Sequence, residues 1–109
     1  MSNNEIGQIK GTVYQQVASG PLAGTGILAT LFGSATTRLT PQSRILGVKS
    51  SQAGGADATT LYSVTVVNGT QAQVLAGQAS VTIQSSLATD TSVITLYWCN
   101  EGATDLRFA

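Results

Sequence analysis

Alternation of apolar and polar residues is the feature that most constrains the fold of this 109-residue chain. In residues 78–85, Ala79, Val81 and Ile83 alternate with glutamine, serine and threonine. A period of two residues is typical of a strand that buries one face. By the same criterion the candidate strands are residues 8–17, 27–32, 44–49, 61–67, 70–75, 78–85, 92–99 and 104–108.

Residues 92–99 predict a central strand, because both faces of this segment are apolar. Leu96 and Trp98 lie on one face, and Val93 and Tyr97 lie on the other. An edge strand or a strand at the surface would pair one apolar face with a polar one.

Turn signals separate the candidate strands. The dipeptide Asn68-Gly69 favours a tight turn, and residues 50–60 predict a long flexible loop. Only residues 23–32 could hold a short helix. This pattern predicts an all-β fold, either an antiparallel β-sandwich or a jelly-roll-like small barrel.

The chain length fits a single domain, which we place at residues 8–109. Residues 1–7 predict a flexible N-terminal arm. Two interpretations of this arm stay open: a frayed terminus, or a segment whose Ile6, together with Ile9, pairs with a neighbouring subunit.

Charge is scarce in this sequence. Charged residues make up 9% of the chain, against about 25% in an average soluble domain. Hydrophobic residues make up 42%, so the composition is not that of a disordered chain. A polar but uncharged surface costs little to desolvate, and this favours a protein that packs against other protein. Zero net charge argues against nucleic-acid binding.

Candidates for catalysis are few. The chain has no histidine, which excludes Ser-His-Asp and Cys-His arrangements. Its single cysteine, Cys99, fits a buried strand position better than a nucleophile. The acids Asp90, Glu101 and Asp105 fall in predicted turns or on a strand's outer face, where we expect them to be solvated. We therefore expect no enzyme, no cofactor and no metal site.

The charges are unevenly distributed along the chain. Residues 1–56 have four basic residues against one acidic residue, a net charge of +3, and residues 57–109 have the reverse, −3. Opposed ends would allow head-to-tail docking on copies of the chain or on a charged lattice, unless the two halves interleave in space. The candidate interface residues are Ile6, Ile9, Arg38, Arg44, Lys49 and Asp57.

Aromatic residues give a second candidate surface. Tyr97 alternates with Trp98 and would lie on the opposite face, so it could form a platform for a sugar ring. Tyr62 is the other candidate for such a platform. Packing of these side chains in the core or in an interface is the alternative interpretation.

In size, in its short polar start (Met1 to Asn4) and in its strands rich in alanine, threonine and serine, the chain resembles a small virion protein of a tailed bacteriophage. Capsid decoration proteins are similar in size and composition. The resemblance covers the whole chain without a diagnostic motif, so no functional residue is carried over. It implies a protein that binds the outside of a capsid, often as a trimer or dimer, and stabilises it.

The leading expectation is therefore a decoration protein whose partners are the major capsid protein and copies of itself. The alternative is a carbohydrate- or receptor-binding module of a phage tail or fibre. Neither a signal peptide nor a transmembrane segment is visible in the sequence. We expect synthesis in the bacterial host cytoplasm, a final location in the virion, and no contact with a membrane.

Overall fold

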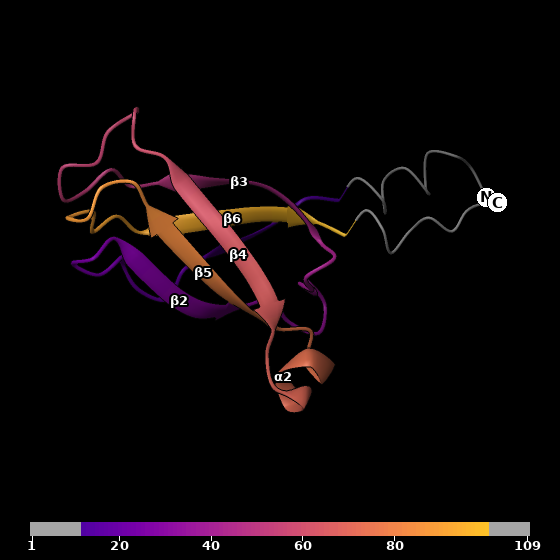
Figure 1. Cartoon of the computed structure of the whole chain (residues 1–109). Helices are drawn as coiled ribbons and strands as arrows, with labels where there is room; N and C mark the ends of the chain where they lie inside the picture. Colours follow the sequence, from indigo (N-terminus) through magenta and orange to yellow (C-terminus); the bar gives the residue numbers. More distant parts are fainter. Residues whose placement is uncertain (1–11, 101–109) are drawn as a thin grey trace.

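The computed structural model describes residues 12–100, which form two three-stranded antiparallel sheets (Figure 1). One sheet has the order β1-β6-β3 and the other has the order β2-β5-β4. The elements are β1 (Tyr14–Val17), β2 (Ile27–Phe32), β3 (Arg44–Ser50), β4 (Tyr62–Asn68), α2 (Gln71–Leu75), β5 (Ala79–Ser85) and β6 (Ile94–Cys99). The predicted all-β antiparallel fold is confirmed, and the two separate sheets make it a small β-sandwich.

The chain crosses repeatedly from one sheet to the other. Among the strands that the structure describes, only β4 and β5 are consecutive strands of the same sheet. As a result β1 and β3 pair with β6, and β2 pairs with β5. The strands of residues 1–56 thus interleave with those of residues 57–109 within each sheet.

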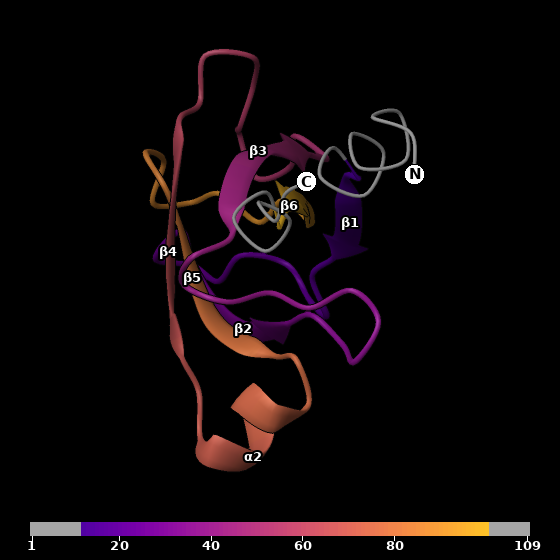
Figure 2. The same cartoon turned by 90° about the vertical axis from the view of Figure 1, so that its right-hand side faces the viewer.

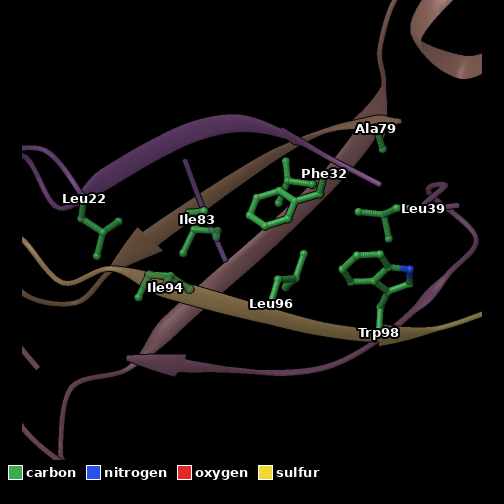
Figure 3. Packing of buried hydrophobic residues seen from close by; sticks show 10 residues of the cluster. Leu22, Phe32, Leu39, Ala79, Ile83, Ile94, Leu96 and Trp98 are labelled. Carbon is green, nitrogen blue, oxygen red and sulfur yellow. The ribbon is translucent and has the colours of Figure 1, made fainter. Parts of the chain in front are cut away.

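The core fills the space between the sheets, as Figure 3 shows. Phe32 and Ile83 from one sheet face Leu96 and Trp98 from the other, and all four side chains are fully buried. Burial of each such side chain contributes roughly 1.5–3 kcal/mol. The Trp98 indole also donates a hydrogen bond from Nε1 to the carbonyl oxygen of Arg38 at 3.0 Å, so its one polar atom is satisfied.

The predicted central strand is confirmed. β6 lies between β1 and β3, and Ile94, Leu96 and Trp98 on its inner face are fully buried. β5 is the central strand of the other sheet, with Val81 and Ile83 fully buried. The predicted strand at residues 104–108 and the predicted arm at residues 1–7 lie outside the described residues.

The link between β4 and β5 corrects two predictions. Residues 70–75 do not form a strand, because α2 occupies this segment, and the short helix is not in residues 23–32, where β2 lies. Thr70 and Gln73 form a reciprocal capping box at the start of α2. Asn68-Gly69 accordingly leads into this helix and does not close a two-residue hairpin.

The end of α2 is fixed by Gly77. The amide of Gly77 donates to the carbonyl of Val74 at 3.0 Å, and the amide of Gln78 donates to the carbonyl of Gln73 at 2.9 Å. This is the Schellman pattern, which requires a left-handed residue after the helix. Gly77 supplies it with a φ of 79°. Within residues 12–100, no helix is long and apolar enough to cross a membrane.

The long loop predicted at residues 50–60 joins β3 to β4 and is tied to the link between β5 and β6. The amide of Ala53 donates to Ser92 Oγ at 2.9 Å, and Thr89 Oγ1 donates to the carbonyl of Gly54 at 3.0 Å. The two connections therefore support each other at one end of the sandwich, and this loop is a bonded part of the fold.

Gly77→Ala tests the helix stop. A Cβ at this position would collide with the backbone oxygen of Ser34, and the positive φ adds strain. We expect a loss of about 1–3 kcal/mol in the free energy of unfolding, measured by urea denaturation. Gly24→Ala is the matched control, because a Cβ there meets nothing within 4 Å. Equal stabilities of the two variants would contradict the role given to Gly77.

Candidate functional site

Asp90 lies in the link between β5 and β6, and its side chain is fully buried (0% exposed). Oδ2 accepts hydrogen bonds from the hydroxyls of Tyr62 and Ser85, both at 2.6 Å, and Oδ1 accepts one from the Ser92 amide at 2.9 Å. The prediction of a solvated turn residue is wrong. The link folds over the end of the sandwich and turns this carboxylate inward.

Two opposing effects set the pKa of Asp90. Burial raises it, but the hydrogen bonds from Ser85, Ser92 and Tyr62 favour the ionised form and together lower the pKa from 3.8 to about 2. A carboxylate with this pKa stays ionised at neutral pH and is a poor proton donor or acceptor there. Its geometry is that of a structural anion that holds hydroxyl and amide donors in place.

The Tyr62 hydroxyl connects Asp90 to a third strand. It lies 2.8 Å from Ser50 Oγ at the end of β3. The hydroxyl is placed to donate to both the Asp90 carboxylate and Ser50 Oγ, which share its single hydrogen. The network thus joins β3, β4 and β5, and it fixes Tyr62 as a half-buried residue with its polar end turned inward.

Neither a metal-binding cluster nor an exposed cysteine is found in the described part of the chain. No group of three acidic or cysteine side chains within residues 12–100 could hold a metal ion. Cys99 is buried, with 6% of its surface exposed.

The outer face of the β1-β6-β3 sheet, called the outer face below, gathers several predicted residues. Strand register places alternate residues on it, opposite the buried face that carries Leu96 and Trp98. Its members are Gln15, Val17, Arg44, Gly47, Lys49, Thr95, Tyr97 and the buried Cys99.

Tyr97 occupies the centre of the outer face. Its Cα partners are Gln15 on β1 and Gly47 on β3. The side chain is half-buried, and an added Cβ at Gly47 would meet nothing within 4 Å, so there is open space beside the tyrosine on one side. The amide side chain of Gln15 lies on the other side of the tyrosine.

Two predicted interface residues share the outer face with Tyr97. Arg44 is paired with Cys99 and Lys49 with Thr95, and both cationic side chains are exposed. Val17, on the opposite edge strand, is 57% exposed. The outer face therefore has an aromatic centre, cations along one edge and an apolar residue along the other.

The remaining predicted interface residues lie elsewhere. Arg38 is in the link between β2 and β3, and its Nη2 donates to the Val74 carbonyl of α2 at 3.4 Å. Asp57 is exposed in the link between β3 and β4, where hydrogen bonds from the Thr59 hydroxyl and amide lower the pKa of its carboxyl. Ile6 and Ile9 lie outside the described residues.

Two residues of these sites, Gln15 and Gly47, were not found from the sequence, and the burial of Asp90 was not predicted. Gln15 and Gly47 flank Tyr97 only because β1 and β3 both pair with β6, and a single sequence carries no signal for strand order. Burial of Asp90 depends on donors from three separate segments. Its only local signal is the closeness in sequence of Ser85 and Ser92, two residues that can donate hydrogen bonds.

Tyr62→Phe tests the Asp90 network by removing one donor from a buried carboxylate. We expect a loss of about 2 kcal/mol in the free energy of unfolding at pH 7, because hydrogen bonds to charged groups contribute about 1.5–3 kcal/mol. Tyr14→Phe is the matched control, since Tyr14 packs against Trp98 with ring centroids 6.1 Å apart and is not bonded to Asp90. Equal losses in both variants would remove the special role of Tyr62.

The lowered pKa of Asp90 also predicts a pH dependence. Since the folded pKa is below the unfolded value, this group stabilises the fold above about pH 4, and the contribution is lost as the pH falls from 3.8 to about 2. Unfolding curves at several pH values in this window should show a steeper decline for the wild type than for Asp90→Asn. Parallel declines would contradict the assignment.

Comparison with known proteins found no match: no protein-family model, no curated protein and no solved structure matches this chain.

Proposed function

We propose that the chain is a structural binding protein that docks through the outer face onto a protein shell, as a capsid decoration protein does. The observation that carries this proposal is the composition of the outer face. Tyr97 lies at its centre, and its two cations lie along one edge strand, β3. Tyrosine supplies a large contact area at a low cost in conformational entropy, and cations at a rim orient a partner of opposite charge.

The energetics of the outer face favour binding over catalysis. Uncharged side chains such as Gln15 and Thr95 lose less hydration energy than charged ones when they are covered. Lys49 would meet an acidic group on the partner. A single contact through the outer face is weak, but many copies bound across a repeating lattice reach high total affinity. The buried carboxylate of Asp90, ionised at neutral pH, supports a structural role for the one buried acid among residues 12–100.

The identity of the partner rests on the resemblance to phage decoration proteins in size and composition. It points to the major capsid protein as the partner, to the virion as the location and to several copies bound per particle. Synthesis in the bacterial host cytoplasm belongs to the same proposal.

A second candidate function follows from the surroundings of Tyr97. Open space at Gly47 on one side and the amide of Gln15 on the other are suited to a sugar ring stacked on the tyrosine. This arrangement favours a carbohydrate-binding module of a phage tail or fibre as the alternative.

The test is binding to empty, expanded shells of the phage that encodes the chain. We expect saturable, stoichiometric binding in a sedimentation assay. Lys49→Glu should weaken the affinity about tenfold or more at low salt and less at high salt. Arg38→Glu is the matched control, because it makes the same change in net charge away from the outer face.

Two outcomes would contradict the proposal. Absence of saturable binding would remove the shell as partner, and loss of binding in Arg38→Glu alone would place the interface elsewhere. A glycan array in which the wild type binds and Tyr97→Ala does not would select the carbohydrate-binding alternative.

A further inference from the structure

β4 forms an open edge of the β2-β5-β4 sheet, visible along one margin of the molecule in Figure 2. The Ser86 amide donates to the Leu61 carbonyl at 2.8 Å, so these two residues form a hydrogen-bonded pair. Hydrogen-bonded and non-hydrogen-bonded pairs alternate along an antiparallel ladder. The residues whose backbone groups point away from β5 are therefore Tyr62, Val64, Val66 and Asn68.

These outward backbone groups are not used inside the described chain. No hydrogen bond from any part of residues 12–100 reaches the amides or carbonyls of this edge. The strand is seven residues long, pairs with β5 without a bulge, and contains no charged residue and no proline. An edge of this kind is a template for the addition of another strand.

The other three edges of the sandwich are protected. β1 has only four residues. β3 carries two cations and a bulge between Ile45 and Gly47. The edge of β2 is bonded to the side chain of Gln16, which donates to the Leu31 carbonyl at 3.4 Å and accepts from the Gly33 amide at 2.9 Å. Because these three edges are protected and the β4 edge is not, β4 is the edge at which another strand can pair.

The β4 sequence is complementary to itself in one antiparallel register. With Thr65 facing Thr65 across a two-fold axis, Val64 pairs with Val66 and Tyr62 pairs with Asn68. In each copy, all four residues whose backbone groups point away from β5 then fall in hydrogen-bonded pairs. No like charges face each other. A shift of this register by two residues leaves at least one of the four residues without a partner in β4 of the second copy.

Exposed apolar residues at both ends of β4 favour a second copy as the occupant. Leu61, just before the strand, and Leu75, in α2 just after it, are each 73% exposed. In this antiparallel pair, Leu61 of one copy lies beside the C-terminal end of β4 of the second copy. The α2 helix of the second copy begins at that end. Both leucines would then lie at the edge of the new interface.

We infer that two copies of the chain associate through β4, about a two-fold axis at Thr65, to form one continuous six-stranded sheet β2-β5-β4-β4-β5-β2. The dimer uses a different sheet from the outer face, so it does not rest on the proposed function. A strand pair buries less than the roughly 1,600 Å² of a standard interface, and we expect dissociation constants in the micromolar range.

Charge substitutions at Thr65 test this inference. Thr65 is exposed, so Thr65→Lys and Thr65→Glu leave the core intact, and circular dichroism checks the fold. In analytical ultracentrifugation we expect a dimer for the wild type, and at least tenfold weaker association for each variant alone. An equimolar mixture of the two variants should regain the dimer, because opposite charges then face each other.

The matched controls are Thr82→Lys and Thr82→Glu. Thr82 is the Cα partner of Thr65 on β5 and is exposed on the same face, but it lies one strand away from the edge. These variants should dimerise like the wild type. A monomeric wild type, or equal association of the Thr65 and Thr82 variants, would overturn the inference.

Disulfide trapping gives a second test of the register. Residues facing each other in a non-hydrogen-bonded pair have Cα atoms about 4.5 Å apart, within the range of a disulfide. Thr65→Cys should form a covalent dimer under mild oxidation, and Thr82→Cys should not. A Thr65→Cys variant that still dimerises but forms no cross-link would place the interface elsewhere. Lys49→Glu should leave the dimer unchanged, which separates this result from failure of the proposed function.

Discussion

The ionised carboxylate of Asp90 is the constraint on which one end of this sandwich depends. The chain crosses between sheets several times, and two of these crossings, β3 to β4 and β5 to β6, meet at this end. A buried charge is costly unless donors surround it, so the donors from Tyr62, Ser85 and Ser92 must be in place together. This requirement ties strands of both sheets to a single arrangement.

Two surfaces of different character follow from sheets of only three strands. Each sheet has one covered face, one open face and two edges. On the β1-β6-β3 sheet the open face carries Tyr97, while the edges are short or charged. On the β2-β5-β4 sheet the edge strand β4 is long and uncharged. Side-chain recognition suits the first surface and backbone pairing suits the second, so one small domain could bind a partner and a second copy together.

The period of two predicted most strands and the inward residues of β5, because burial of one face imposes this pattern directly. The central position of β6 was predicted from the two apolar faces of residues 92–99. α2 was missed although Thr70, Gln73 and Gly77 carry its cap signals, because its five residues are too short for a helical period. The surroundings of Tyr97 and the burial of Asp90 depend on contacts between distant segments. Such contacts follow from strand order, which hydrophobic periodicity does not encode.

The most direct test of this account is the pKa of Asp90 itself, measured by NMR from the pH dependence of its carboxyl carbon shift. The hydrogen-bond network predicts a midpoint at about 2, well below the ordinary value of 3.8. A midpoint at or above 3.8 would show that burial outweighs the donors, and it would contradict the structural anion on which the description of the sandwich rests.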